Sequence, residues 1–348
     1  MKCTLCPRGC GVDRAVVQGF CRAGREPEIA AVCAHRGEEP PISGRRGICN
    51  VFFAHCNLQC VYCQNWQITR ETEAGLTHSS VSRADSSPNL GEQPEIQLAP
   101  DPAEDNATNR ASHSSPKLGE VPEGRRSVLI DRIASVLQET ENILGFVTPT
   151  HYADSIPPIV EELHRRGLHP VTVYNSSGYE TVETLRMLEP YIDVYLPDFK
   201  YADPGIAARY SHAPDYPERA LAALREMYRQ KGSSLITEPL PGADGEEEIA
   251  VSGIIVRHLV LPGCVDNSIK VLDAIADLSM NLHVSLMAQY YPPRPGLPDQ
   301  LNRTLKADEY DTVVNHFHAT GLHNGWLQEL SAQTTFRPDF SSSTPFSS

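Results

Sequence analysis

The chain has 348 residues, of which 40% are hydrophobic, so it is long enough to bury the core of one large α/β domain. Its formal net charge of −14 argues against binding the phosphate backbone of a nucleic acid, and no segment has the roughly 18 consecutive apolar residues of a membrane span. The residues after Met1 lack the apolar run of a signal peptide. We therefore predict a cytoplasmic protein without nucleic-acid or membrane partners.

Nine of the ten cysteines lie between Cys3 and Cys63, which in a reducing compartment indicates metal binding or catalysis rather than disulfides. Residues 1–46 form a predicted Cys-rich, metal-binding extension. Its four cysteines Cys3, Cys6, Cys10 and Cys21 are predicted to bind a zinc ion or an iron–sulfur cluster, and the alternative is that they are free thiols. Spacing does not separate a structural zinc from a second cluster that transfers electrons. Of the other cysteines, Cys33 and Cys49 are expected to be small buried hydrophobic residues, while Cys264 follows Pro262 and Gly263 in a predicted turn.

From Gly47 onward, short apolar runs alternate with amphipathic helical patterns, which is typical of βαβ units and a parallel sheet. The predicted strands are 48–53, 143–147, 170–174, 192–196, 253–261 and 282–286. The predicted helices are 128–141, 155–166, 181–189, 216–230, 268–279 and 306–320. Six strand–helix units are fewer than the eight of a closed barrel. We therefore predict an α/β fold with an open, partial (β/α)6 TIM-like barrel over residues 47–330 and a flexible tail at 331–348.

A polar segment, residues 71–126, interrupts this predicted barrel. It contains an internal repeat, because SSPNLGE at 86–92 recurs as SSPKLGE at 114–120, an offset of 28 residues. Two copies with few apolar residues do not make a solenoid, which needs several repeats with a buried face. We predict a disordered, low-complexity surface insertion, and a partner-binding role is the alternative.

Three cysteines follow the first predicted strand within eight residues: Cys56, Cys60 and Cys63. Functional loops of parallel α/β folds lie beyond the carboxyl ends of the strands, and soft thiolates select zinc, copper(I) or iron–sulfur clusters. Structural zinc needs a fourth ligand, and neither His55 nor His78 is well placed to supply it. A cluster on three cysteines instead leaves one iron open for another molecule. We predict such a cluster, and a zinc knuckle is the alternative.

This C-x3-C-x2-C pattern after a first strand, with the aromatic residue Tyr62 before the last cysteine, resembles the radical S-adenosylmethionine (SAM) enzymes. The resemblance covers about three quarters of the chain, but not the insertion, and is strongest toward the pyruvate formate-lyase activating enzymes and their uncharacterised relatives. It rests on CVYCQN at 60–65, YNSSGY at 174–179, LPDFK at 196–200 and VRHLVLPG at 256–263. The head, CTLCPRGCGV at 3–12, resembles that of the uncharacterised relatives.

The resemblance implies a 4Fe–4S cluster whose open iron binds the amino and carboxylate groups of SAM. An electron from an external donor such as a flavodoxin or ferredoxin then cleaves SAM to a 5′-deoxyadenosyl radical, which removes hydrogen from the substrate. In this family Asp-x-Lys and Arg-x-apolar positions line the SAM pocket. Together with neighbouring strand ends, this nominates as cofactor-binding residues Tyr62, Thr148, Thr150, Asn175, Ser177, Asp198, Lys200, Arg257 and Leu259.

The charged nominees also suit SAM on physical grounds. Asp198 can accept hydrogen bonds from ribose hydroxyls or from the amino group, while Lys200 and Arg257 can meet the carboxylate. The alternative is that Asp198 and Lys200 form an ion pair at a strand end without any ligand, since such pairs are common and contribute little.

Two departures from the family pattern bear on the substrate. Residues 148–151 read TPTH where many radical SAM enzymes have Gly-Gly-Glu, although threonine hydroxyls can accept the same hydrogen bonds, and Asn175 stands where the activating enzymes tend to have aspartate. His151 follows a strand and is interpreted either as an acid–base group facing the pocket or as a structural histidine. Residues 287–292 either close the pocket or belong to the core.

The leading functional hypothesis is therefore a radical SAM oxidoreductase, like the activating enzymes, that abstracts hydrogen from a backbone glycine of a partner protein. A second hypothesis keeps this chemistry but modifies a small molecule or another polypeptide site. A third, of another class, is a non-catalytic scaffold that binds zinc at both groups of cysteines.

Overall fold

The computed structural model describes residues 2–69, 123–240, 247–334, 337–342 and 345–346. Most of the predicted insertion at 71–126 lies outside the described residues, together with its repeat. Its last four positions do not belong to an irregular segment, because helix α3 (Glu123–Glu139) begins there.

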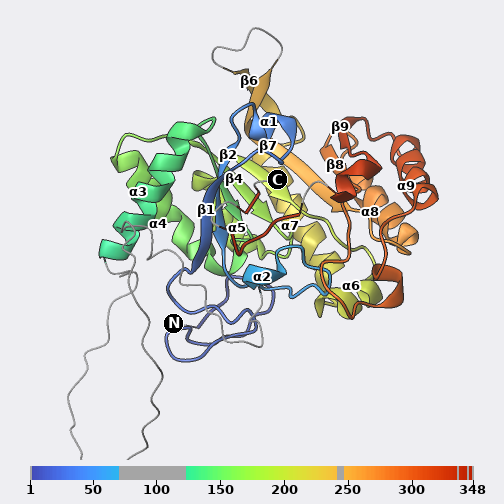
Figure 1. Ribbon diagram of the computed structural model, residues 1–348, viewed down its shortest axis with the longest axis horizontal. Helices are drawn as coiled ribbons and strands as arrows, with labels where there is room; N and C mark the ends of the chain where they lie inside the picture. Colours follow the sequence, from blue (N-terminus) through green and yellow to red (C-terminus); the bar gives the residue numbers. More distant parts are fainter. Residues whose placement is uncertain (1, 70–122, 241–246, 335–336, 343–344, 347–348) are drawn as a thin grey trace, which may run out of the picture.

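The described residues form one open, mostly parallel sheet of nine strands (Figure 1). Seven strands run parallel, in the order of the chain, from β2 to β9, while β1 is antiparallel to β2 and β6 is antiparallel to β7. The outermost strands β1 and β9 do not pair, so the sheet does not close into a barrel. The bounds are β1 Ile29–His35, β2 Ile48–Phe53, β3 Ile143–Val147, β4 Val171–Ser176, β5 Val194–Pro197, β6 Ile236–Pro239, β7 Glu248–Leu259, β8 His283–Met287 and β9 Asn324–Leu327.

All six predicted strands are confirmed, as β2, β3, β4, β5, β7 and β8, and the α/β class with a mostly parallel sheet is confirmed with them. The sheet is larger than predicted, because β1, β6 and β9 were not expected. Two of the three additions lengthen the sheet at its edges, and β9 makes a seventh parallel strand.

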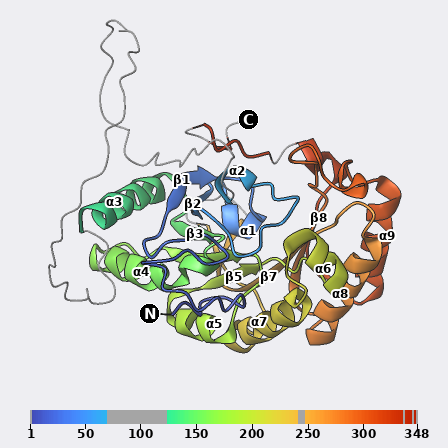
Figure 2. The ribbon, with the colours of Figure 1, turned by 90° about the horizontal axis from the view of Figure 1, so that it is seen from below.

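The six predicted helices are also confirmed, and Figure 2 shows them as an arc outside the sheet. They are α3, α4 (Ile156–Arg165), α5 (Val182–Leu188), α7 (Tyr216–Lys231), α8 (Val265–Leu278) and α9 (Ala307–Ala319). Three shorter helices were not predicted: α1 (Pro40–Ser43), α2 (Trp66–Thr69) and α6 (Pro204–Ser211). No described helix is both long and apolar enough to cross a membrane.

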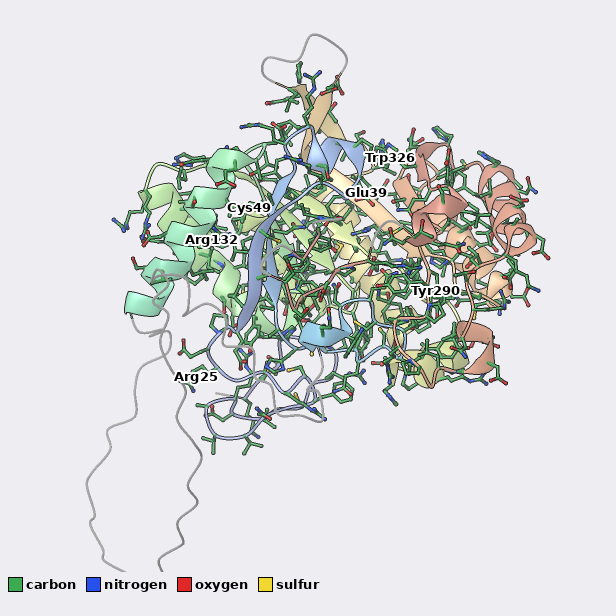
Figure 3. The ribbon with its side chains drawn as sticks, in the orientation of Figure 1. Arg25, Glu39, Cys49, Arg132, Tyr290 and Trp326 are labelled. Atoms are coloured by element: carbon green, nitrogen blue, oxygen red, sulfur yellow. The ribbon has the colours of Figure 1, made fainter. Side chains whose placement is uncertain are left out.

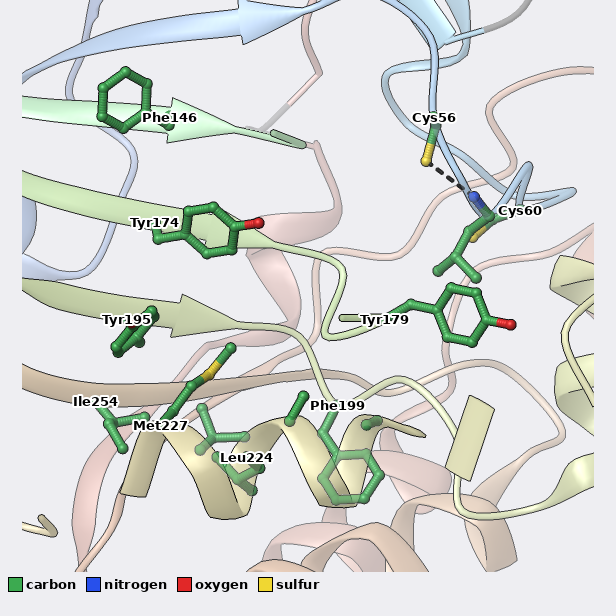
Figure 4. Packing of buried hydrophobic residues seen from close by; sticks show 14 of the residues in the cluster. Cys56, Cys60, Phe146, Tyr174, Tyr179, Tyr195, Phe199, Leu224, Met227 and Ile254 are labelled. Carbon is green, nitrogen blue, oxygen red and sulfur yellow. Dashed lines mark hydrogen bonds between the residues drawn. The ribbon is translucent and has the colours of Figure 1, made fainter. Parts of the chain in front are cut away.

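The main core lies between the sheet and these outer helices. Aromatic side chains of neighbouring strands, including Phe146, Tyr174 and Tyr195, belong to one buried cluster with Leu224 and Met227 of α7, and Tyr195 lies next to Met227 (Figure 4). The expectation that Cys33 and Cys49 are buried is confirmed, and Cys264, which follows the turn at Pro262 and Gly263, is buried as well. Cys49 lies on β2 facing α3, near the labelled Arg132 in Figure 3.

The inner face of the curved sheet is covered from the amino-terminal side of the chain. After β1 the chain crosses this face near the amino-terminal ends of the strands. There Ile42 of α1 packs in a cluster with Ile48, Ile143 and Val173. Residues 1–46, predicted as an extension, thus supply both a strand of the sheet and the α1 segment that packs on its inner face. A cavity lies on the part of this face that is nearer the carboxyl ends of the strands.

The carboxyl ends of the parallel strands are level with one another. Phe52 pairs with Val147, Val147 pairs with Asn175, and Asn175 pairs with Leu196 across four strands. Because parallel strands end at a common edge, loops far apart in the sequence meet there.

Candidate functional site

The loop that follows β2 carries Cys56, Cys60 and Cys63 at this carboxyl edge. Cys56 and Cys60 are buried and Cys63 is half-buried. Burial, with smaller contributions from the neighbouring thiols of Cys60 and Cys63, raises the pKa of Cys56 to about 12. The three sulfur atoms are therefore close enough to influence one another, and a metal centre is what would make them thiolates.

Each of these sulfurs lies beside a hydrogen-bonding group. The backbone N–H of Leu58 donates to Cys56 Sγ at 3.4 Å, and the Ser211 hydroxyl donates to Cys60 Sγ at 2.9 Å (Figure 4 shows Cys56 and Cys60). The Cys63 sulfur lies 3.3 Å from Thr69 Oγ1. Donors directed at sulfur stabilise a thiolate and tune a metal centre held by it.

Within the part of the chain that the structure describes, no three Cys, His, Asp or Glu side chains stand in the ligating geometry of a single ion. The fit of this loop to a metal centre therefore rests on its donor set: three soft thiol ligands and the hydrogen-bond donors beside them.

A cavity of about 200 Å³ opens against this loop. All three cysteines line it, and so do eight of the nine nominated cofactor-binding positions, namely Tyr62, Thr148, Asn175, Ser177, Asp198, Lys200, Arg257 and Leu259. Tyr62 comes from the loop after β2, and the other seven come from the ends of β3, β4, β5 and β7. The structure thus brings the predicted site together around one space.

Thr150 is the nominated residue that does not line the cavity. Its hydroxyl donates to Glu180 Oε1 at 2.7 Å, and the Tyr174 hydroxyl donates to the other carboxylate oxygen at 3.1 Å. Glu180 is buried in the core, and burial raises its pKa to about 7, although the hydroxyls of Thr150, Ser176 and Tyr174 oppose the shift. Sequence reasoning missed this buried carboxyl, because Glu180 follows directly on the nominated loop without any distinctive pattern.

Glu180 makes stability depend on pH. Below pH 4.5 the carboxyl is protonated in both states, whereas between 4.5 and about 7 the folded state holds the proton more tightly, so stability falls as pH rises through this window. The loss is on the order of 3 kcal/mol. We expect Glu180→Gln, which resembles the protonated acid, to remove this fall when urea unfolding is compared at pH 5 and pH 8. An equally steep fall in the variant would contradict the assignment.

The groups that interact electrostatically with Glu180 do not ionise in this range. Burial raises the pKa of every one of them, and they are Cys6, Tyr174, Tyr195 and Tyr216. The difference in pH dependence between the wild type and Glu180→Gln therefore reports Glu180, because the buried histidines contribute equally to both proteins.

Arg257 is not free to act as a simple carboxylate-binding group. Its guanidinium pairs with Glu38, Nη1 to Oε2 at 3.1 Å, and with Glu39, Nε to Oε1 at 3.3 Å. The Glu38 carboxylate also accepts from Asn175 Nδ2 at 3.3 Å and lines the cavity. Burial and the neighbouring Glu38 raise the pKa of Glu39, while Arg257 opposes the shift. Gly37 and Glu38, in the segment between β1 and α1, line the cavity, and Figure 3 shows the next residue, Glu39, close to α1.

Asp198 and Lys200 form the ion pair that the ligand-free alternative expects, and both line the cavity. Burial alone would lower the pKa of Lys200, but Asp198 and the nearby thiols of Cys60 and Cys63 outweigh it and raise the pKa. The buried hydroxyl of Tyr216 accepts from Lys200 N at 2.9 Å and lies 2.9 Å from the carbonyl oxygen of Asp198. The pair is thus held rigidly at the end of β5.

Two buried polar atoms on the cavity wall have neither a hydrogen-bond partner nor an ion-pair partner among the described residues. They are Ser177 Oγ and His35 Nδ1. A buried polar atom without a partner is costly, and such atoms are rare in folded proteins. Both are therefore suited to a polar ligand in the cavity.

His151 does not face the cavity, contrary to the first interpretation. It is buried, its Nε2 lies 2.7 Å from the Ala54 carbonyl oxygen, and burial lowers its pKa to about 3. The structural interpretation is the one that fits, because an imidazole that stays neutral at physiological pH and bonds to backbone holds two loops together.

Segments from the end of the chain complete the cavity. Met287 and Gln289 line it, while Tyr290 packs edge-on against Tyr62, so residues 287–292 contribute to both the pocket and the core. Phe346 of the predicted tail also lines it, with its ring centroid 4.0 Å from that of His35. Nothing in the sequence pattern predicted Phe346 or Glu38 as site residues, because neither follows a predicted parallel strand. Only the folded path of the chain brings them to the cavity.

Comparison with known proteins gives one relative and no assigned activity. No protein-family model matches the chain. The chain is 25% identical over 315 residues to an uncharacterised protein of Methanocaldococcus jannaschii, and the match covers 90% of this chain and 73% of that protein. The similarity is therefore not confined to the cysteine motif.

Proposed function

We propose that this protein is a radical SAM enzyme, which holds a 4Fe–4S cluster on Cys56, Cys60 and Cys63 and reductively cleaves SAM to a 5′-deoxyadenosyl radical. The observation that carries the proposal is the common cavity, because three thiol ligands and the polar ends of four strands line one space. The open sheet, with its strands in chain order, supports the finer interpretation of a partial (β/α)6 barrel.

The chain's own residues divide the work by chemistry. Lys200 offers a cation for the SAM carboxylate, and Asp198 offers an acceptor for hydroxyl or ammonium groups. Ser177 and Asn175 add neutral donors and acceptors on the adjacent strand end. When bound, the cluster supplies the electron that breaks the sulfonium carbon–sulfur bond. The Ser211 hydroxyl holds a hydrogen bond on one of its ligands, Cys60.

The test is anaerobic reconstitution with iron and sulfide, followed by incubation with SAM and a strong reductant. We expect 5′-deoxyadenosine to form in proportion to the cluster content. A protein with a confirmed cluster that forms none would refute the proposal, and zinc in place of iron at both groups of cysteines would support the scaffold hypothesis instead.

Ser177→Ala is expected to weaken SAM binding about 5- to 10-fold, the cost of losing one hydrogen bond to the ligand. The folded protein should lose no stability, because the hydroxyl has no protein partner within the described structure. Equilibrium binding and urea unfolding measure the two effects. Thr184→Ala is the matched control, since that buried hydroxyl donates to Leu5 O and its loss should affect stability rather than SAM. Unchanged SAM affinity in Ser177→Ala would remove Ser177 from the site.

The substrate, the reductant and the compartment are further parts of the proposal. From the resemblance we propose a backbone glycine of a partner protein as the substrate, a flavodoxin or ferredoxin as the electron donor, and a reducing, cytoplasmic location. A glycyl radical that appears by electron paramagnetic resonance in a candidate partner only with this enzyme and SAM would support the glycine assignment. Turnover of a small molecule instead would support the second hypothesis.

A further inference from the structure

The four cysteines of the head lie near one another on two backbone turns and do not line the cavity just described. As with the other described side chains, no three of them stand in the ligating geometry of a single ion, so their fit to a metal rests on the donor set and the turns that carry it. A hairpin closed by the Lys2–Asp13 bridge carries Cys3, Cys6 and Cys10, with Cys3 N donating to Val12 O at 2.8 Å. The next loop brings Cys21 to this hairpin. All four sulfurs interact electrostatically through Cys6 and Cys21.

Backbone N–H groups lie beside the two buried sulfurs. Those of Arg8 and Ala23 lower the pKa of Cys6 and Cys21 against the effect of burial, in each case from two residues further along the chain. In the candidate cluster loop, which carries Cys56, Cys60 and Cys63, a backbone N–H two residues further along also serves a cysteine, since Leu58 N–H donates to Cys56 Sγ. Because a thiol is a weak acceptor and a thiolate is a strong one, these turns suit sulfurs that bind a metal.

The chain also makes room for a third sulfur. A Cβ atom on Gly19 would lie 2.7 Å from Cys10 Sγ, so the Cys10 sulfur lies directly against the loop before Cys21. The head has few buried apolar side chains of its own, and segments this small usually need a disulfide or a metal to hold their shape. The cysteines form no disulfide.

We infer that Cys3, Cys6, Cys10 and Cys21 bind a second thiolate-ligated metal centre, a zinc ion or an iron–sulfur cluster. Four protein ligands fill a tetrahedral zinc or a four-iron cluster, so this centre has no open position for substrate and differs from the one proposed at Cys56, Cys60 and Cys63. Its role is to order the head.

The head in turn supports the candidate cluster loop from outside. The Arg8 guanidinium, two residues from Cys6, donates to Asn57 O at 2.8 Å and to Ser211 O at 3.0 Å. Gln59 Nε2 donates to Phe20 O, beside Cys21, at 3.0 Å. A metal that orders the turns at Cys6 and Cys21 therefore also positions the loop between Cys56 and Cys60.

The experiment uses the full chain, purified anaerobically, and a thiol-alkylating reagent with mass spectrometry of each cysteine. Cys10 is exposed, so as a free thiol it would react at once. We expect Cys10 to resist alkylation until a chelator removes the metal, and then to react quickly. Immediate alkylation of Cys10 in metal-containing protein would overturn the inference.

Metal analysis of variants gives the second readout. Cys21→Ser should lose one zinc, or roughly four iron atoms, per chain relative to the wild type, and which metal is lost identifies the centre. Cys264→Ser, which removes a buried thiol outside both groups, should lose neither. Unchanged zinc and iron in folded Cys21→Ser would overturn the inference, and alkylation of the wild type decides if that variant does not fold.

The outcome is separable from that of the proposed function. Cys60→Ser should lose the iron of the other site while Cys10 stays protected. A protein that cleaves no SAM but still protects Cys10 would refute the radical SAM proposal alone, and one that cleaves SAM with Cys10 unprotected would refute only the second centre.

Discussion

Replacing Cys60 by serine is expected to lower the rate of 5′-deoxyadenosine formation by at least roughly 10³-fold, since changes beside a metal ligand already cost about 10- to 100-fold. The Cys60 sulfur is buried and accepts the Ser211 hydroxyl, so a serine hydroxyl there would be a harder, poorer ligand for iron. The measurement is product formation per chain after anaerobic reconstitution, together with iron content.

Two variants make this result specific. Cys264→Ser removes a buried thiol outside both groups and should keep the wild-type rate and iron content. Ser211→Ala keeps all three ligands but removes the hydrogen bond to Cys60, and should fall between the two, with a cluster that is harder to reduce. Cys60→Ser protein with full activity would show that this cysteine holds no cluster.

The sequence predicts the strands that are buried on both faces and misses those at the margins. Strands β2 and β3 are buried throughout, so β3 reads as an uninterrupted apolar run and β2 as a run interrupted only by Asn50, and both of their bounds were predicted without error. The edge strand β1 has half-buried residues, β6 includes Pro239, and β9 is four residues long with alternating exposure. None of these patterns separates a strand from a loop.

The same physical distinction applies to the site. Residues that follow predicted parallel strands, such as Ser177 and Asp198, meet because those strands end at one edge. Glu38 and Phe346 reach the cavity by the path of the chain after β1 and beyond β9, and local sequence does not encode such a path. Thr150 also followed a predicted strand, but its hydroxyl turns to the buried Glu180 instead.

Gly178→Ala is expected to lower the free energy of unfolding by about 2–5 kcal/mol, since two costs combine at this position. Gly178 has φ +73°, in the left-handed region, and a Cβ atom there would lie 2.1 Å from the carbonyl oxygen of Asp198. That oxygen belongs to the backbone and is held near the Tyr216 hydroxyl, so it has no easy way to move aside. Urea unfolding measures the loss, and SAM binding should weaken with it because Asp198 is displaced.

Gly167→Ala separates the two costs. Gly167 has φ +77°, almost the same backbone conformation, but an added Cβ there would meet nothing within 4 Å. It should therefore lose only the roughly 1–2 kcal/mol of a left-handed alanine and leave SAM binding unchanged. Equal losses in both variants would mean that the β4 and β5 loops separate freely. A larger loss in Gly178→Ala would mean that the close contact between Gly178 and Asp198 fixes the wall of the cavity, and with it the position of the Asp198–Lys200 pair.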